Sequence, residues 1–227
     1  MNMTARLFIL SLPVLFGVAC TPPKPMPHGA IQVRVASEPE KAALFMAGRP
    51  IGEAPHALTV ASAEDLLQVS ATLSNEVVVE KRIRFLSQDQ AEILFVFGAG
   101  KSTMARTLGL PKILVFDYGA GVTFDLNQAS LKPGFLPLLE RQAGLLKTHF
   151  QGLDIFVCGH TDSTGTQERN LSLSLDRARA VSSDLSGRGV PAERLKIQGF
   201  GSQYPVTSND TEQGRALNRR TELILPQ

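Results

Sequence analysis

One segment constrains the fold of this 227-residue chain most: a short apolar run that leads through a polar loop into an amphipathic stretch. Residues 153–158, LDIFVC, are rich in β-forming side chains and end at Gly159. From Asn170 onward, apolar residues recur at helical spacing, at Leu171, Leu175, Ala178, Val181 and Leu185. The segment therefore predicts a strand, a loop and a helix that begins at Asn170, and such a crossover is a common place for a ligand.

This loop and helix carry two opposite charges that can face one another. At about 100° per residue, Asn170, Ser174 and Arg177 lie in one line, beside the apolar stripe rather than inside it. Long helical side chains point back towards the helix N-terminus, so Arg177 should face the loop that contains Asp162. An exposed carboxylate and a guanidinium on one pocket would suit the zwitterionic end of an amino acid. The alternative is an ordinary surface salt bridge between Asp162 and Arg177.

The residues around this pair form a longer pattern. It reads G-H-T-D, a glycine, then N-x-x-L-S-x-x-R-A-x-x-V, and it is carried by Gly159, His160, Thr161, Asp162, Gly165, Asn170, Leu173, Ser174, Arg177, Ala178 and Val181. Further matches follow at Gly199, Phe200, Gly201, Pro205 and residues 214–220, GRALNRR. The pattern resembles the signature of the OmpA-like C-terminal domain, the peptidoglycan-binding module also found in Pal and the MotB family.

The resemblance implies a ligand and a set of binding residues. Asp162 and Arg177 would hold the ammonium and the carboxylate of meso-diaminopimelate in the cell-wall peptide. Supporting groups that would line the same pocket are Thr161, Asn170, Asp125, Asn127 and Arg219. For Asn170, an N-cap role at the start of the helix is an equal alternative, and both roles are compatible.

The first residues of the chain have the composition of an export signal. Residues 1–20 hold one charge, at Arg6, and an apolar core that is too short to span a membrane stably. The ending Gly17-Val18-Ala19-Cys20 resembles a lipobox, so Cys20 should be acylated, although an ordinary secretory peptide cut near Ala19 is the alternative. Thr21 beside the cysteine fits outer-membrane sorting by the family rule for lipoproteins, with the protein facing the periplasm.

Residues 21–30 follow as a tether with prolines at positions 22, 23, 25 and 27, which favour an extended polyproline conformation. The chain has 2 cysteines, so lipidation of Cys20 leaves Cys158 without a disulfide partner. A lone thiol in an apolar strand is most often a small core residue.

Residues 31–98 contain several β-rich runs separated by turn residues. The expected strands are 31–35, 43–46, 58–60, 66–72, 77–85 and 93–97, which together predict a small all-β sandwich or barrel. The stretch SEPEKAALFMAGRPIGEAPHALTV resembles the PEGA domain, with Lys41 standing where that family has a glycine. That family suggests a surface-exposed adhesive or spacer module.

Residues 99–111 are expected to be a linker, and residues 112–227 a second domain. The FGAGKST run at 97–103 resembles the end of a P-loop, but the first glycine of that motif would be residue 95, which is Phe95. In residues 112–227, Pro133 suits an early helical position, and apolar spacing predicts one helix face formed by Phe135, Leu138, Leu139, Gln142, Leu145 and Leu146. The whole chain is predicted to be α+β, its second domain a β-α-β-α-β-β unit with two main helices on one face of a mixed sheet.

Catalysis and metal binding have weak support in this sequence. His160, Asp162 and Ser163 are near neighbours on one loop, whereas a triad needs side chains that converge from separate elements. The four histidines have no ligand spacing, no cofactor motif is present, and a net charge of +2 requires no nucleic-acid partner. We therefore expect a non-enzymatic outer-membrane lipoprotein that binds peptidoglycan. The alternative is a wall-anchored adhesion or assembly subunit whose β-rich domain binds a protein partner in the envelope.

Overall fold

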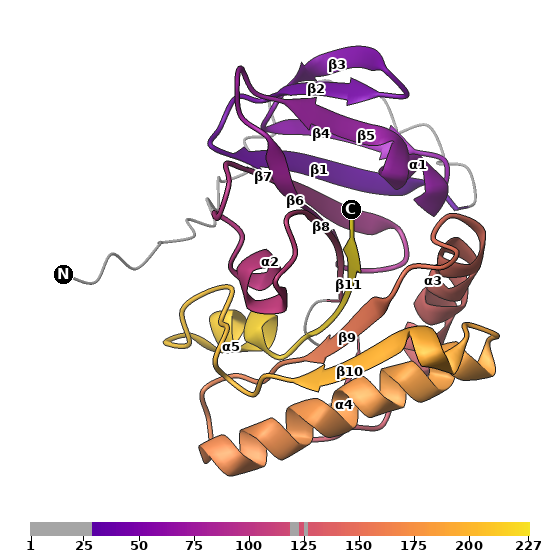
Figure 1. Ribbon diagram of the computed structural model, residues 1–227, viewed down its shortest axis with the longest axis vertical. Coiled ribbons are helices and arrows are strands. Elements are labelled where there is room, and N and C mark those ends of the chain that lie inside the picture. The colour runs from indigo at the N-terminus through magenta and orange to yellow at the C-terminus, as the bar shows by residue number, and fades with distance from the viewer. Residues whose placement is uncertain (1–28, 119–122, 125–126) are drawn as a thin grey trace, which may run out of the picture.

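An eight-stranded mixed sheet runs through both halves of the chain in the computed structural model, which describes residues 29–118, 123–124 and 127–227 (Figure 1). Its strand order is β10-β9-β11-β8-β6-β7-β1-β4. The pairs β10–β9, β8–β6 and β7–β1 are parallel and the others are antiparallel. Cys20, residues 1–28 of the expected signal and tether, and Asp125 lie outside the described residues.

The N-terminal half supplies four strands to this sheet and three to a second, smaller one. The large sheet receives β1 (Ile31–Glu38), β4 (His56–Val60), β6 (Val78–Phe85) and β7 (Gln90–Phe97). The small sheet has the order β3-β2-β5, formed by β3 (Arg49–Glu53), β2 (Ala43–Met46) and β5 (Val69–Thr72). The β-rich prediction for this half holds for most of its residues, but its strands do not form a separate sandwich or barrel, because four of them belong to the sheet that continues into the C-terminal half.

A short helix interrupts the strand that was expected at 66–72. Helix α1 spans Ala63–Gln68, and β5 begins only at Val69. The helix forms because Ser62 and Asp65 make a capping box, in which each side chain accepts a hydrogen bond from the other residue's backbone N–H. At the other end, the Lys81 ammonium donates to the carbonyls of Leu66, Leu67 and Val69. The N-terminal half is therefore not all-β.

The segment expected to be a linker is part of the packed structure. Helix α2 (Thr103–Leu108) lies within residues 99–111, and its N-cap Ser102 is buried and donates to the carboxylate of Glu80 at 2.6 Å. On either side of this segment, β6 and β8 (Ile113–Tyr118) pair directly. One apolar cluster continues across the expected boundary, where the Phe85 and Tyr118 rings stack with centroids 5.7 Å apart.

The C-terminal half adds strands β9 (Ile155–Gly159), β10 (Leu195–Gly199) and β11 (Thr221–Pro226). Two long helices, α3 (Leu136–Thr148) and α4 (Gln167–Gly187), cover one face of this part of the sheet (Figure 1). Short 3-10 turns precede α3 at Pro133–Phe135 and β10 at Ala192–Arg194. The expected apolar face of α3 is confirmed, because Phe135, Leu138, Leu139, Gln142, Leu145 and Leu146 are all buried.

The other face of these strands is covered by α2 and by Phe200 and Tyr204, which pack on Val115, Cys158 and Ile224. Cys158 is thus a buried core residue, as expected. The loop expected before β11 contains a further helix, α5 (Glu212–Asn218), capped by the Thr211 hydroxyl. Within the described residues, no helix has the length and apolar character needed to cross a bilayer.

Candidate binding pocket

The loop after β9 lies against the first turns of α4 because three glycines let the backbones approach. A Cβ on Gly159 would lie 1.9 Å from the Ser174 carbonyl oxygen, and one on Gly199 would lie 2.8 Å from the Leu175 nitrogen. Gly201 has φ 52°, in the left-handed region that favours glycine, and its N–H donates to the Ser174 hydroxyl at 2.9 Å. These contacts hold the ends of β9 and β10 against α4, at the place where the loop of residues 160–166 begins.

Helix α4 begins earlier than its apolar pattern predicted. Its N-cap is Thr166, whose hydroxyl accepts from the Arg169 N–H at 3.2 Å, so the N-cap role considered for Asn170 is wrong. Asn170 lies inside the helix, and its side-chain amide is 3.4 Å from the Asp162 carbonyl oxygen. Apolar spacing could not locate this start, because residues 167–169 form the first turn of α4 but are polar and solvent-facing. The N-cap is instead recognised by the hydroxyl of Thr166, a residue type preferred at that position.

The buried face of α4 also differs from the predicted stripe. In the first turns the buried side chains are Asn170, Ser174 and Arg177, while Leu171 is 45% exposed and Leu175 is half-buried. Further along, Ala178, Val181 and Leu185 pack into the core as predicted. The N-terminal end of α4 faces the polar loop rather than the core, which is why polar residues occupy its inner side.

Asp162 is held by three hydrogen bonds and is only 3% exposed, although an exposed residue was expected. Its Oδ1 accepts from the Thr164 N–H at 2.8 Å and from the Thr164 hydroxyl, and its Oδ2 accepts from Arg219 Nη1 at 2.7 Å. Burial alone would raise the pKa of Asp162, but the bonds from Thr164 and Arg219 outweigh it and lower the pKa below its usual value. Asp162 is therefore a well-held anion.

Arg177, on the same pocket, is also buried, at 2% exposure. Its Nε donates to the Gln128 carbonyl at 3.0 Å, its Nη1 is 3.5 Å from the His160 carbonyl, and its guanidinium lies 5.1 Å from the Phe124 ring centre. Burial, together with the nearby Arg219 cation, lowers the pKa of Arg177 to about 10, so it stays charged at neutral pH. The salt bridge of Asp162 goes to Arg219, so the simple Asp162–Arg177 surface pair is not the arrangement found.

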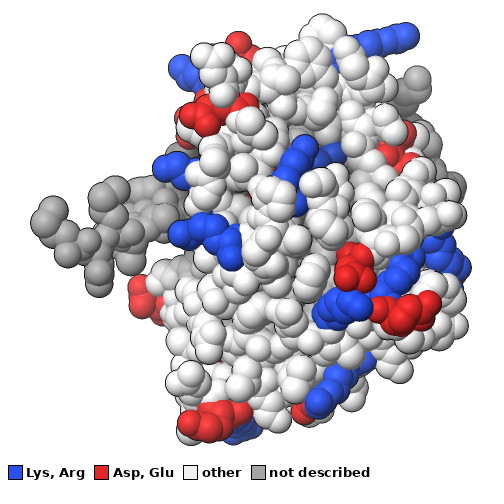
Figure 2. Space-filling view, viewed as in Figure 1, with Lys and Arg blue, Asp and Glu red and all other residues white. Residues whose placement is uncertain are grey.

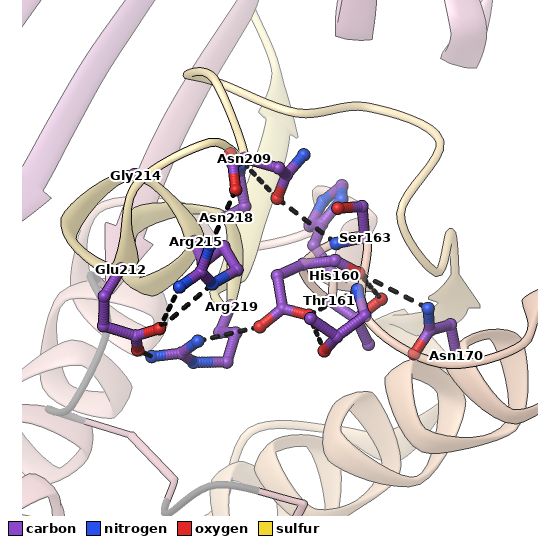
Figure 3. A network of polar contacts seen from close by, with 12 residues as sticks. His160, Thr161, Ser163, Asn170, Asn209, Glu212, Gly214, Arg215, Asn218 and Arg219 are labelled. Atoms are coloured by element: carbon purple, nitrogen blue, oxygen red, sulfur yellow. Dashed lines mark hydrogen bonds and ion pairs between the residues drawn. The ribbon is translucent and has the colours of Figure 1, made fainter.

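Helix α5 brings Arg219 to the loop. The Arg219 guanidinium bridges Asp162 and the exposed Glu212, each at 2.7 Å (Figure 3). Asn218 holds the preceding loop by accepting from the N–H groups of Val206 and Thr207. Asn209 in that loop accepts from the Ser163 N–H at 3.2 Å, which ties the α5 region to the loop after β9 (Figure 3).

These groups surround one pocket of about 220 Å³. All six of the predicted binding residues that the structure describes line it: Asn127, Thr161, Asp162, Asn170, Arg177 and Arg219. The lining also includes Thr164, Gly165, Arg169 and Leu173, which the sequence did not single out as binding groups. A volume of this size suits an amino-acid end rather than a large ligand. An ionised carboxylate and guanidinium groups on its wall suit a zwitterion.

Behind the pocket lies a sealed group of charges that the sequence did not predict. Glu222 accepts from Arg220 at 2.8 Å and from Arg82 at 2.5 Å, and Arg82 also contacts Asp117 and Glu80 at 3.2 and 2.8 Å. We refer to Glu80, Arg82, Asp117, Arg220 and Glu222 as the buried ion network. On the molecular surface, by contrast, charges of both signs are interspersed on the face shown in Figure 2.

His160 connects this network to the pocket. Its Nε2 lies 3.3 Å from Glu222 Oε2, its ring stacks on Phe200 at 5.5 Å, and its carbonyl faces Arg177. Burial, helped by the Arg220 cation and opposed by Glu222, lowers the pKa of His160, which favours the neutral ring. These contacts hold His160 within the packed interior of the domain.

Comparison with known proteins places the pocket in a family. The model of the OmpA family matches residues 123–219. The probable lipoprotein YiaD of Escherichia coli K12 is 40% identical over 112 residues, which cover 49% of this chain and 51% of that protein. The peptidoglycan-binding protein ArfA of Mycobacterium tuberculosis H37Rv is 37% identical over 107 residues, covering 47% of this chain and 32% of ArfA.

Among solved structures, the peptidoglycan-associated lipoprotein from Burkholderia pseudomallei is 36% identical, with a TM-score of 0.43, and the match covers 46% of this chain and 87% of that one. The chain spans about half the length of YiaD and a third of ArfA. Residues 123–219 therefore form an OmpA-family domain, as the sequence pattern indicated.

Proposed function

We propose that this protein binds peptidoglycan through the zwitterionic end of meso-diaminopimelate and holds the outer membrane to the cell wall without turnover. The observation that carries the proposal is the pocket on which Asp162, Arg177 and Arg219 converge. Membership of the OmpA family, with relatives named as peptidoglycan-binding and peptidoglycan-associated proteins, supports the ligand class.

The bonds of Asp162 leave room for an ammonium group. A carboxylate offers about four lone-pair positions, and Thr164 and Arg219 use three of them. The remaining position, on Oδ2, could accept a charge-assisted bond from a ligand ammonium. The ligand carboxylate would then bind the Arg177 guanidinium, whose planar fork matches its two oxygens.

The rest of the chain would supply the attachment to the membrane. In this proposal Cys20 carries the lipid, residues 21–30 form the tether, and residues 31–98 form a PEGA-like module that shares one sheet with the wall-binding residues 112–227. Lys41 has a φ of 69°, in the left-handed region that favours glycine, which agrees with the glycine that the PEGA family has at this position. Mass spectrometry of protein extracted from membranes tests the anchor: an N-terminal fragment that begins at an unacylated residue would refute it.

Alanine variants test the pocket. Losing one partner of a desolvated charge pair costs on the order of 2 to 5 kcal/mol, so Asp162→Ala and Arg177→Ala should each weaken binding at least tens-fold. Binding is measured by calorimetry with a diaminopimelate-containing tripeptide and by co-sedimentation with purified sacculi. Asp176→Ala and Arg179→Ala are matched controls, since this exposed pair lies on the same helix and away from the pocket.

Folding has to be checked separately, because Arg177 is buried and also holds backbone carbonyls. Circular dichroism and thermal melting report on it. Arg177→Lys keeps the cation but loses the two-pronged geometry, so it should bind worse than the wild type even when fully folded. Wild-type affinity in folded Asp162→Ala and Arg177→Lys variants would show that the ligand binds elsewhere.

A further inference from the structure

The pocket wall holds more positive than negative charge. In the described part of the lining, Arg169, Arg177 and Arg219 stand against a single carboxylate, Asp162. Arg219 is already bound between Asp162 and Glu212, and Arg177 is assigned to the diaminopimelate carboxylate. A diaminopimelate end is neutral overall and is matched by Asp162 and Arg177, so it offers no group to Arg169.

Arg169 is the cation that remains available for a ligand. It is exposed, it lies in the first turn of α4, and its backbone N–H is satisfied by the Thr166 hydroxyl. Among the described residues, none forms an ion pair or hydrogen bond with its guanidinium. A fork of five N–H donors on a pocket rim is suited to a carboxylate.

We propose that Arg169 binds a second carboxylate of the wall peptide, on the residue next to the diaminopimelate. This inference rests on the proposed function, because it assigns a further part of the same ligand. In the stem peptide, the glutamate before diaminopimelate is linked through its side-chain carboxyl, which leaves its α-carboxylate free. That group gives the ligand the additional negative charge that the pocket favours.

The spacing on α4 agrees with a contact to a neighbouring residue of the peptide. Arg169 and Arg177 are eight positions apart, and at a rise of about 1.5 Å per residue their Cα atoms are separated by roughly 12 Å. Side chains as long as arginine can reduce this gap by several ångströms. The two guanidiniums would therefore meet two different carboxylates of one peptide rather than the same one.

The test compares two tripeptides, L-Ala-γ-D-Glu-meso-diaminopimelate and the same peptide with the glutamate α-carboxyl amidated. Calorimetric titrations use the full chain at about 0.1 M salt, where exposed charges are only partly screened. For an exposed charge contact we expect the wild type to bind the free peptide about fivefold more tightly than the amidated one. Arg169→Gln should lose this preference and bind both peptides like the wild type binds the amidated form.

Arg179→Gln is the matched control, because it removes the same charge from an exposed position of α4 that lies away from the pocket. It should keep the fivefold preference. An equal loss on both peptides in Arg169→Gln, or no loss on either, would overturn the assignment of Arg169 while leaving the Asp162–Arg177 site intact. Failure of the wild type to bind either peptide would overturn the proposed function itself.

Discussion

Arg219 and Arg220 are neighbours in the chain, but their guanidiniums enter opposite environments. Arg219 pairs with Asp162 at 2.7 Å and its side chain is 18% exposed at the pocket. Arg220 pairs with Glu222 at 2.8 Å and is 1% exposed inside the buried ion network. The two pairs have nearly the same length, so distance does not separate a binding site from a structural contact. Solvent exposure separates them, because a ligand can reach the Arg219–Asp162 pair at the pocket but cannot reach the enclosed Arg220–Glu222 pair.

The largest expected effect is on the free energy of unfolding, when each of the two arginines is replaced by methionine. Arg220→Met leaves Glu222 buried with one arginine fewer, which should lower the free energy of unfolding by about 3 to 5 kcal/mol. Arg219→Met leaves Asp162 with its two hydrogen bonds from Thr164 and removes a side chain that is 18% exposed, so it should lower the free energy of unfolding by less, about 1 kcal/mol. Urea denaturation of both variants measures the difference. Equal losses would show that enclosure does not distinguish the two pairs.

A smaller effect is expected in the pH dependence of stability, which separates the contribution of Asp162 from that of Glu222. The pKa of Asp162 is lowered in the folded state, so its stabilising contribution is complete above the ordinary value of 3.8 and is lost as pH falls through the lower folded value. The difference in unfolding free energy between the wild type and Asp162→Asn should thus shrink below pH 3.8, by up to about 1 kcal/mol. A constant difference from pH 6 to pH 2.5 would contradict the role of the Arg219 bond.

Glu222 provides the internal reference for this titration. Burial would raise its pKa, but Arg220, Arg82 and His160 together lower it well below its ordinary value. Its contribution should therefore persist to more acidic conditions than that of Asp162.

The pocket could be anticipated from sequence because most of it is local. Asp162 and Arg177 lie within one strand–loop–helix unit, where helical geometry alone indicates that the arginine faces the loop. Arg219 comes from a distant helix, and only the family pattern pointed to it. Nothing in the sequence pointed to Arg169, because an arginine just before the predicted helix start looks the same whether it binds a ligand or only faces solvent.

The buried ion network could not be anticipated, since it depends on which strands become neighbours. Arg82 meets Glu222 across 140 positions of the chain. In the sequence, Glu80, Arg82 and Arg84 are typical of an exposed strand surface. The continuous sheet depends on the same distant pairings, and the glycine, lysine and serine residues around Ser102 are typical of a linker in sequence.

The pairing of β6 with β8 has a mechanical consequence. The two strands lie parallel over six positions, from Glu80 opposite Ile113 to Phe85 opposite Tyr118. A force that pulls the two halves of the molecule apart along these strands would load their backbone hydrogen bonds together, in shear. Each hydrogen bond then carries only a share of the force, so the β6–β8 pair would resist extension. Under load, the chain would lengthen first in segments outside the sheet.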